Sequence, residues 1–325
     1  MSEPRPKRRV AVLDLGSASF HLVIADVEEP ASISVITDKR EDLELGRSVG
    51  ETGGVERSRT DRAVRVARRF AHKAERARAT DVIVVATSAL RIASNGDGLL
   101  ERIESETGRE VRTISGEAEA ILSYVGARAG LSLADEPTVV ADLGGGSLEV
   151  ACGVGSHVLA TASLPLGSLR LAGEWIDNDP PSAAEWRRLA LHVWDTMTEL
   201  EDFGTDGPGL VVTGGTGKAL ARLDARDERV NLEGGYRLDR DAINRLEYRL
   251  LSSKRSDRRE MKGMGERRVD SAGPGAAVLH ALMETLGVGH LTVSRWGFRE
   301  GIMLATLRSG GRSMLVEMEA AEPAA

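Results

Sequence analysis

The stretch Asp142-Leu143-Gly144-Gly145-Gly146-Ser147 is a second version of Asp14-Leu15-Gly16-Ser17-Ala18-Ser19, near the start of the chain. Each version follows a short β-branched, apolar run and precedes a second apolar run, residues 20–27 in one case and 148–154 in the other. This order is typical of a strand, a tight Gly/Ser turn and a returning strand. The duplication therefore predicts two domains that are built on the same hairpin.

The two turns have the composition of an anion-binding loop. A tight turn rich in Gly and Ser directs several backbone N–H groups at one point, and glycine lets an anion approach closely. The aspartate that ends the first strand of each hairpin, Asp14 or Asp142, is suited to hold a metal ion or a water molecule. We expect two such turns, facing each other across a cleft, to bind a chain of phosphates from both sides.

Length and composition describe an ordinary globular protein. The chain has 325 residues, 41% of them apolar and 29% charged, which suits two domains that each bury a core. Aromatic residues make up only 3%, so stacking on bases is not expected to dominate binding. The single cysteine, Cys152, excludes an internal disulfide and a cysteine metal cluster, and its apolar surroundings predict a buried side chain.

Other classes of protein are disfavoured. No stretch approaches the roughly 18 apolar residues that span a bilayer. The basic start, residues 1–9, lacks the apolar middle of a signal peptide, so we expect a cytoplasmic protein with no membrane partner. The net charge of −7 argues against a general nucleic-acid binder. A polyanionic substrate stays open, because a local basic groove is sufficient to bind it.

Hydrophobic periodicity predicts mixed strands followed by alternating helices and strands, twice over, and hence two α/β domains joined near residue 120. Further strands are predicted at 31–37, 81–86, 111–114, 157–164, 210–213 and 291–294. Helices are predicted at 59–79, 98–107, 115–129, 182–203, 239–252, 270–286 and 301–307. Residues 41–54 and 261–265 are predicted to be loops.

Five segments together resemble the Ppx/GppA phosphatase family of exopolyphosphatases and guanosine pentaphosphate phosphohydrolases, in the order and spacing of that family. They are residues 14–17, 86–95, 115–120, 142–149 and 164–167. The resemblance implies the fold of actin, Hsp70 and sugar kinases (the ASKHA fold), with two ribonuclease-H-like α/β domains around a central cleft. Domain I is expected to comprise residues 1–122 and 296–325, and domain II residues 123–295.

The same resemblance implies an acidic catalytic group. Glu119 matches the family's glutamate base, and Asp142 and Glu149 match its other acidic positions. Together with Asp14, the latter two are expected to hold Mg²⁺, because hard oxygen ligands suit this ion. Structural alternatives stay open: Glu119 also fits a first-turn carboxylate that complements a helix dipole, and an aspartate after a strand often accepts hydrogen bonds from its own turn.

Phosphate binding is expected from both turns and from one arginine, which matches the family's phosphate-contacting arginine. The residues are Ser17, Ser19, Arg91, Gly144, Gly145, Gly146 and Ser147. The chain departs from the family where Ala18 replaces the usual Asn and Leu148 the usual Thr. The basic stretch 249–268 fits either a guide for a polyphosphate tail or a solvated segment.

The resulting hypothesis is an exopolyphosphatase that releases terminal orthophosphate from inorganic polyphosphate, with a Glu base and Mg²⁺. Three alternatives stay open: a guanosine pentaphosphate 5′-phosphohydrolase acting on (p)ppGpp-type substrates, a non-catalytic polyphosphate or nucleotide sensor, and a phosphotransferase of the sugar-kinase type. Homodimers are common among relatives, and nothing in the sequence specifies an interface.

Overall fold

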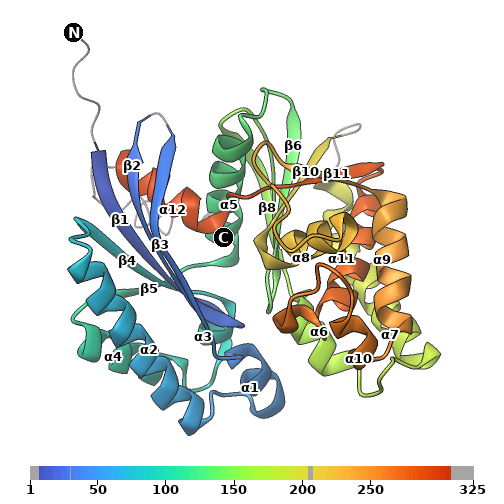
Figure 1. Cartoon of the computed structure of the whole chain (residues 1–325), viewed down its shortest axis with the longest axis horizontal. Helices are drawn as coiled ribbons and strands as arrows, with labels where there is room; N and C mark the ends of the chain where they lie inside the picture. Colours follow the sequence, from blue (N-terminus) through green and yellow to red (C-terminus); the bar gives the residue numbers. More distant parts are fainter. Residues whose placement is uncertain (1–6, 30, 204–207, 309–325) are drawn as a thin grey trace. The chain divides into compact units, whose positions relative to one another are not determined.

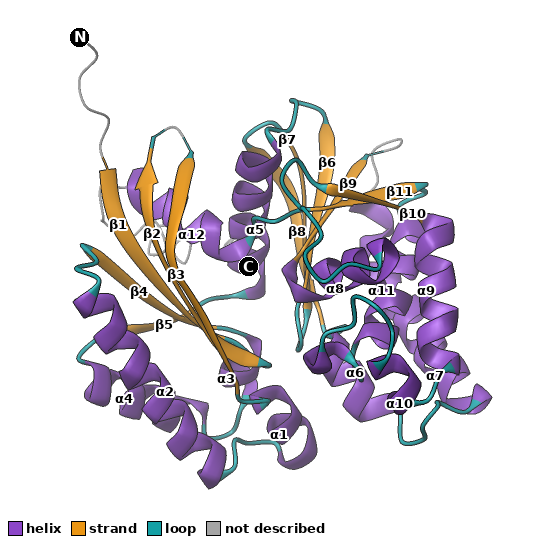
Figure 2. Ribbon diagram, in the orientation of Figure 1, coloured by secondary structure: helices purple, strands orange, loops and turns teal. Residues whose placement is uncertain are grey.

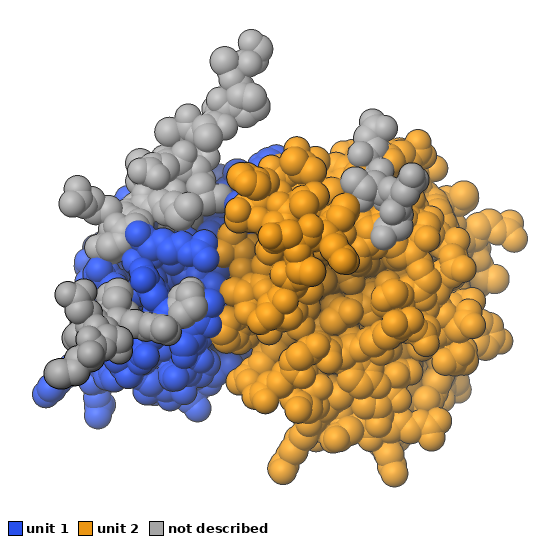
Figure 3. All heavy atoms as spheres, turned by 90° about the horizontal axis from the view of Figure 1, so that it is seen from above, with its two compact units in different colours: residues 1–122, 299–325 blue, residues 123–298 orange. Residues whose placement is uncertain are grey.

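A computed structural model describes residues 7–29, 31–203 and 208–308 (Figure 1). The chain divides into two compact units, which Figure 3 distinguishes by colour. Unit 1 comprises residues 1–122 and 299–325, and unit 2 comprises residues 123–298. The sequence predicts that domain II begins at residue 123 and ends at residue 295. Residues 309–325 of the predicted domain I lie outside the described residues.

Unit 1 contains a five-stranded sheet in the order β3-β2-β1-β4-β5. The first three strands form an antiparallel meander, and β4 and β5 extend it in parallel. The strands are β1 (Lys7–Leu15), β2 (Ser19–Glu28), β3 (Ser32–Asp42), β4 (Asp81–Ala86) and β5 (Val111–Thr113).

Unit 2 repeats this plan in a six-stranded sheet, ordered β10-β11-β9-β6-β7-β8. The strands β6, β7 and β8 form an antiparallel meander, β9 and β11 continue in parallel, and β10 adds an antiparallel edge. The strands are β6 (Pro137–Leu143), β7 (Leu148–Val154), β8 (His157–Leu164), β9 (Gly209–Thr213), β10 (Tyr236–Asp239) and β11 (His290–Val293). The prediction of two mixed α/β domains is confirmed.

Helices follow the strands in both units, as Figure 2 shows. In the first half they are α1 (Leu45–Thr52), α2 (Arg57–Arg76), α3 (Ser88–Ile92), α4 (Gly96–Thr107) and α5 (Gly116–Leu131), which crosses the boundary between the units. In the second half they are α6 (Ser168–Trp175), α7 (Ala183–Met197), α8 (Gly214–Ala225), α9 (Arg240–Ser252), α10 (Arg255–Arg259), α11 (Ala272–Thr285) and α12 (Phe298–Arg308), with 3₁₀ turns at Thr198–Phe203 and Glu266–Arg268.

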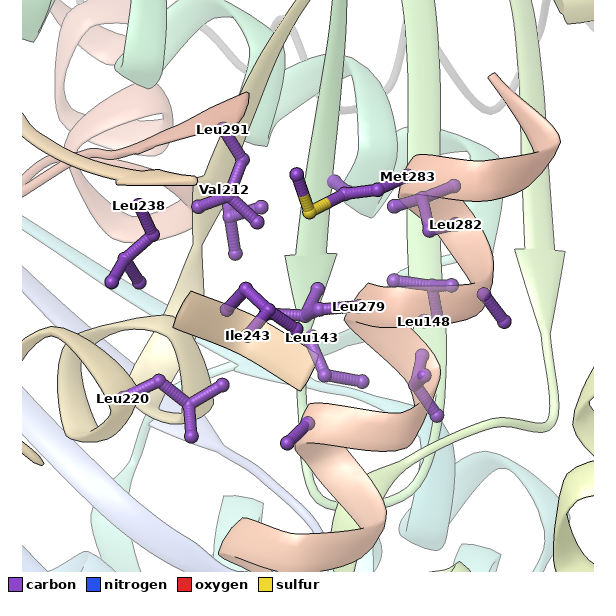
Figure 4. Close-up of a cluster of buried hydrophobic side chains, with 14 of the residues drawn as sticks. Leu143, Leu148, Val212, Leu220, Leu238, Ile243, Leu279, Leu282, Met283 and Leu291 are labelled. Atoms are coloured by element: carbon purple, nitrogen blue, oxygen red, sulfur yellow. The ribbon is translucent and has the colours of Figure 1, made fainter. Parts of the chain in front are cut away.

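Each unit has its own apolar core on one face of its sheet. In unit 1, Leu13 and Leu15 of β1 face Phe70 and the small residues of α2, which recur at the predicted helical spacing. In unit 2, the side chains of α8, α9 and α11 cover alternate residues of β6, β7 and β9 (Figure 4). Cys152 is buried in this second core, as predicted.

This alternation decides where the functional residues lie. Val139, Ala141 and Leu143 of β6 enter the core, so Asp142 lies on the opposite face of the sheet. In the same way, Leu13 and Leu15 of β1 enter the core of unit 1 and leave Asp14 on the other face.

One predicted loop is wrong in part. Residues 45–52, inside the predicted loop 41–54, form helix α1 because Leu45 and Val49, four residues apart, both reach the core of unit 1. The side-chain hydroxyl of Ser48 donates to the carbonyl of Gly54 and accepts from the N–H of Glu56, which ties the helix to the residues that follow it. The loop predicted at 261–265 is confirmed, and it is anchored, since Met261 and Met264 are each only 7% exposed within the core of unit 2.

Sequence periodicity also missed the short elements α3, α6, α10 and β10, whose lengths of four to eight residues carry too little pattern. No helix in the described part of the chain is long and apolar enough to cross a membrane.

Candidate active site

The first Gly/Ser turn is closed by a backbone hydrogen bond from Gly16 N–H to the carbonyl of Ser19, at 3.2 Å. Two carbonyl groups of the turn are bound by the following segment. Gly46 N–H donates to the carbonyl of Ser17, and the N–H groups of Leu43 and Glu44 donate to that of Ala18. Main-chain hydrogen bonds therefore hold the turn in place, and it does not need the asparagine side chain that Ala18 replaces.

The second turn closes in the same way, from Gly144 N–H to the carbonyl of Ser147 at 3.0 Å. The start of α6 binds its carbonyl groups: the N–H groups of Ser168 and Arg170 donate to Gly144 and Gly145, at 3.1 and 2.9 Å. Gly167 lies directly against this turn. A β-carbon on Gly167 would clash with the backbone of Gly146 and Ser147. Because the supporting element binds the carbonyl side of each turn, the amide side is the one oriented for an anion.

A row of polar residues crosses the sheet of unit 2 at the level of the second turn. Strand register places Glu149 opposite Asp142 on the neighbouring strand, and Ser163 opposite Glu149 on the next. On the other side of Asp142 the parallel strand β9 contributes Thr213. Residues in register share one face of a sheet, with Cβ atoms about 5 Å apart in antiparallel pairs. The two predicted acidic positions are thus direct neighbours.

Each carboxylate of this pair is oriented by a serine. The hydroxyl of Ser123 in α5 donates to Asp142 Oδ2 at 3.0 Å, and the hydroxyl of Ser163 donates to Glu149 Oε1 at 3.2 Å. Glu149 is only 3% exposed. A β-carbon on Gly214 would lie 2.5 Å from Asp142 Oδ1, so the turn at the start of α8 packs closely against this carboxylate.

The equivalent row in unit 1 carries different charges. His21 takes the place opposite Asp14 that Glu149 takes opposite Asp142. Arg299 of α12 donates to Asp14 Oδ2 at 2.9 Å, and His21 Nε2 lies 2.6 Å from Asp38 Oδ1. Burial, followed by the positive charge of Arg299, lowers the pKa of His21 below its usual value.

Arg91 and Glu119 form an ion pair in unit 1. The Nη1 atom of Arg91 donates to Glu119 Oε1 at 3.0 Å and also to the backbone carbonyl of Ile114. Glu119 lies in the first turn of α5 and is 9% exposed. The hydroxyl of Ser115 accepts a hydrogen bond from Ala118 N–H at 3.2 Å and so caps the start of this helix. Glu117, the neighbouring carboxylate, is exposed.

The sequence pattern of the Ppx/GppA phosphatase family matches residues 23–309, most of the chain and all of the motif-bearing segments after the first turn. The chain belongs to this family. Membership places it among the phosphatases, which are hydrolases. Exopolyphosphatase 1 of Mycobacterium tuberculosis is 30% identical over 314 residues, which cover 93% of this chain and 89% of the relative. Exopolyphosphatase 1 of Mycobacterium leprae is 30% identical over 309 residues, with 93% and 90% covered.

Solved structures agree with this membership of the Ppx/GppA family. The family member from Aquifex aeolicus has a TM-score of 0.81 and 28% identity over 95% of this chain and 100% of its own. An exopolyphosphatase from Cytophaga hutchinsonii has a TM-score of 0.84 and 26% identity over 93% and 98%. The expected two-domain, actin-like fold is therefore confirmed.

The carboxylates of unit 2 fit a hard divalent cation. Mg²⁺ is commonly bound through one or two carboxylates, with the remaining positions taken by water and phosphate oxygens. Asp142 and Glu149 meet this requirement because they are adjacent on one sheet face. The buried hydroxyl of Thr213, in the same row, has no hydrogen-bond partner among the described residues and is suited to bind a water. Within the described ranges, no group of three or more His, Cys, Asp or Glu residues forms a metal cluster.

Asp14 is the third predicted metal ligand, and one of its carboxylate oxygens already accepts a hydrogen bond from Arg299. An arginine at this position supplies the positive charge that a cation would supply in unit 2. Ser17 is also partly engaged, because its hydroxyl accepts the backbone N–H of Ala89 at 3.1 Å, which leaves its proton to donate.

The predicted residues thus gather in two groups. Unit 1 holds Asp14, Ser17, Ser19, Arg91 and Glu119, and unit 2 holds the turn 144–147 with Asp142 and Glu149. Sequence reasoning missed three residues that orient or balance them, Ser123, Ser163 and Arg299, and it did not place Thr213 beside Asp142. For Ser163 a signal existed, since the register of two tight hairpins places it beside Glu149. Arg299 and Ser123 depend on helix packing and carried no such signal.

Proposed function

We propose that the protein is an exopolyphosphatase that removes terminal orthophosphate from inorganic polyphosphate. The observation that carries the proposal is the ion pair between Glu119 and Arg91. It puts a carboxylate suited to act as a base beside a guanidinium suited to bind phosphate, in a chain that is 30% identical to mycobacterial exopolyphosphatases over 93% of its length.

In the proposed reaction, a water molecule attacks the terminal phosphorus atom in line with the bridging oxygen that leaves. Glu119 accepts a proton from this water. The P–O bond to the bridging oxygen breaks, and the shortened polyphosphate leaves with the bonding electron pair. Orthophosphate is the other product, so atoms and charge balance without any further reactant.

Most of the barrier to phosphoryl transfer is lowered by positioning and by neutralisation of charge. We assign this work to Arg91, to the hydroxyls of Ser17 and Ser19, and to the amide groups and hydroxyl of residues 144–147. Asp142 and Glu149 would hold Mg²⁺, which would neutralise charge on the phosphate oxygens when bound. Asp14 accepts a hydrogen bond from Arg299, so we assign it to positioning the first turn and not to binding Mg²⁺.

The test is orthophosphate release from polyphosphate with Mg²⁺ by wild type, Glu119→Gln and Glu117→Gln. Glutamine keeps the acceptor oxygen that Arg91 contacts, so the Glu119 variant loses the base and little of the local structure. We expect it to lose about 10²–10⁴-fold in kcat. Glu117 is exposed in the same helical turn, so its variant is the matched control and should retain wild-type turnover.

The alternatives make different predictions in the same assay. Release of the 5′ terminal phosphate from guanosine pentaphosphate, with no release from polyphosphate, would favour the nucleotide substrate, although the aromatic content of 3% offers few rings to stack on guanine. Polyphosphate binding without turnover by wild type would indicate a sensor. ATP-dependent transfer to a sugar would indicate a kinase.

A further inference from the structure

Helix α2 concentrates positive charge in an acidic protein. Its 20 residues include eight arginine or lysine side chains and two acidic ones, whereas the whole chain carries a net charge of −7. The helix lies on one face of the sheet of unit 1, beside α4 (Figure 1). Its apolar residues face the core, so the basic side chains are on its outer side.

Four of these side chains form a single stripe, which we call the basic ridge: Arg62, Arg65, Lys73 and Arg76. With 3.6 residues per turn, these positions lie within one quarter of the circumference of the helix, and the stripe is about 21 Å long. All four are exposed. Within the described ranges, no ion pair joins any of them to a carboxylate.

Three other arginines of α2 have carboxylate neighbours. Arg69 pairs with Glu41, Arg68 with Glu106, and Arg59 approaches Glu56. Arg69 lies within the same quarter of the circumference as the ridge, so its pairing with Glu41 interrupts the uncompensated charge there. Most of the unpaired charge of the helix is on the ridge, with one further unpaired arginine, Arg57, among the described residues.

The basic stretch 249–268, which the sequence offered as a polyphosphate guide, has a different environment. Arg258 is only 8% exposed and pairs with Asp179, while Arg255 pairs with Asp270 and Arg259 with Glu266. Arg258 is thus enclosed in unit 2, whereas Arg255 and Arg259 are exposed and have their charges compensated by the paired carboxylates.

A short chain of contacts links α2 to the first phosphate-binding turn. Arg59, near the start of the helix, donates to the carbonyl of Leu43 at 2.6 Å. The N–H group of Leu43 in turn donates to the carbonyl of Ala18 at 3.1 Å. The start of the helix is thus bonded to the segment that supports the first turn. The basic ridge extends from there toward the C-terminal end of the helix.

We propose that the basic ridge of α2 is a second binding surface for inorganic polyphosphate, outside the catalytic residues, which holds the internal phosphates of long chains. The proposal rests on the proposed function. A linear polyanion with regularly spaced charges matches a linear stripe of cations. Binding along it would release counterions, so the affinity for long chains should fall steeply with salt. Short chains would reach the catalytic residues only.

The test compares hydrolysis of tripolyphosphate and of long-chain polyphosphate by two quadruple variants. The ridge variant is Arg62→Gln, Arg65→Gln, Lys73→Gln and Arg76→Gln. The control variant changes four exposed arginines of unit 2 by the same total charge: Arg187→Gln, Arg188→Gln, Arg222→Gln and Arg245→Gln. Glutamine has a helix propensity close to that of arginine and lysine, so both variants should fold. Thermal midpoints verify this.

We expect the ridge variant to raise KM for long-chain polyphosphate about tenfold or more at low salt, with kcat/KM for tripolyphosphate unchanged. The slope of log KM against log salt should fall by roughly 3, at about 0.7 for each of four phosphate contacts. The control variant should match wild type on both substrates. Equal long-chain KM values for the two variants would overturn the inference and leave the proposed function intact, because tripolyphosphate turnover would persist.

Failure of the proposed function has a separate signature, which is no turnover of either substrate by wild type. Direct binding of fluorescent long-chain polyphosphate then tests the ridge alone. Weaker binding by the ridge variant only would support it, and equal binding would overturn it. Duplex DNA that displaces polyphosphate at equal phosphate concentration would show a nucleic-acid surface instead, and would overturn the assignment to polyphosphate.

Discussion

The guanidinium of Arg91 donates to the carboxylate of Glu119 at 3.0 Å, between two segments that are 28 residues apart. Arg91 also donates to the backbone carbonyl of Ile114, just before α5 begins. One arginine therefore orients the proposed base and ties it to the strand end that precedes its helix. Its remaining donors are suited to phosphate, since the planar guanidinium presents five N–H groups.

Replacing Arg91 with alanine should lower kcat/KM for polyphosphate by about 100-fold or more, because a positioned charge on the phosphate and a contact to the base are both lost. The effects of Arg91→Ala and Glu119→Gln should be far from additive, since the two groups touch. Steady-state kinetics of the two single variants and the double variant measure this. Additive losses would mean that the pair does not act as one unit.

Asp142→Asn and Glu149→Gln should each weaken Mg²⁺ binding about tenfold or more, because each removes a hard, charged oxygen ligand from adjacent positions on one sheet face. Calorimetric titration of Mg²⁺ into the protein without substrate gives this directly. Asp195→Asn, an exposed position on α7, is the control for the change in net charge. Unchanged Mg²⁺ affinity in both site variants would exclude this pair as the metal site.

Gly214→Ala should destabilise the protein by more than about 2 kcal/mol. Gly214 has φ = +82°, and its β-carbon would lie 2.5 Å from Asp142 Oδ1 and 2.8 Å from the carbonyl of Leu143. Urea unfolding measures the loss. Gly98→Ala is the matched control: Gly98 is helical and exposed with nothing near its β-carbon, so alanine there should stabilise by up to about 1 kcal/mol. A similar response at both sites would refute the steric argument.

The acid sensitivity of unit 2 should depend on Glu185. A hydrogen bond from the hydroxyl of Ser182, followed by bonds from backbone N–H groups, lowers the pKa of Glu185 to about 2. Because the folded-state pKa is depressed, this carboxylate stabilises the fold fully above its ordinary pKa of 4.5, and the contribution is lost as pH falls toward 2.

Glu185→Gln checks this by urea unfolding at several pH values. The difference in stability between wild type and variant should be largest at neutral pH and should shrink steadily below pH 4.5. Other titrating groups are common to both proteins and cancel. A difference that stays constant from neutral pH down to pH 3 would contradict the role assigned to the Glu185 charge.

Local sequence determined a large part of this protein. The two Gly/Ser turns were visible because a tight turn needs particular residues, and a tight turn between two strands sets their register. Asp142 and Glu149 therefore had to be cross-strand neighbours once the hairpin was recognised. The cores of both units followed from helical and strand periodicity, which reports how a segment divides between apolar and polar surroundings.

Tertiary structure alone decided which groups balance these residues. Arg299 meets Asp14 across 285 positions of the chain, Ser123 of helix α5 meets Asp142 of strand β6, and Arg91 meets Glu119 after an intervening helix and strand. Such pairs leave no periodic trace, because the packing of whole helices and sheets brings them together. The sequence accordingly showed two equivalent aspartates at two equivalent turns. Only the fold distinguishes them, since Asp14 meets an arginine and a histidine where Asp142 meets a second carboxylate.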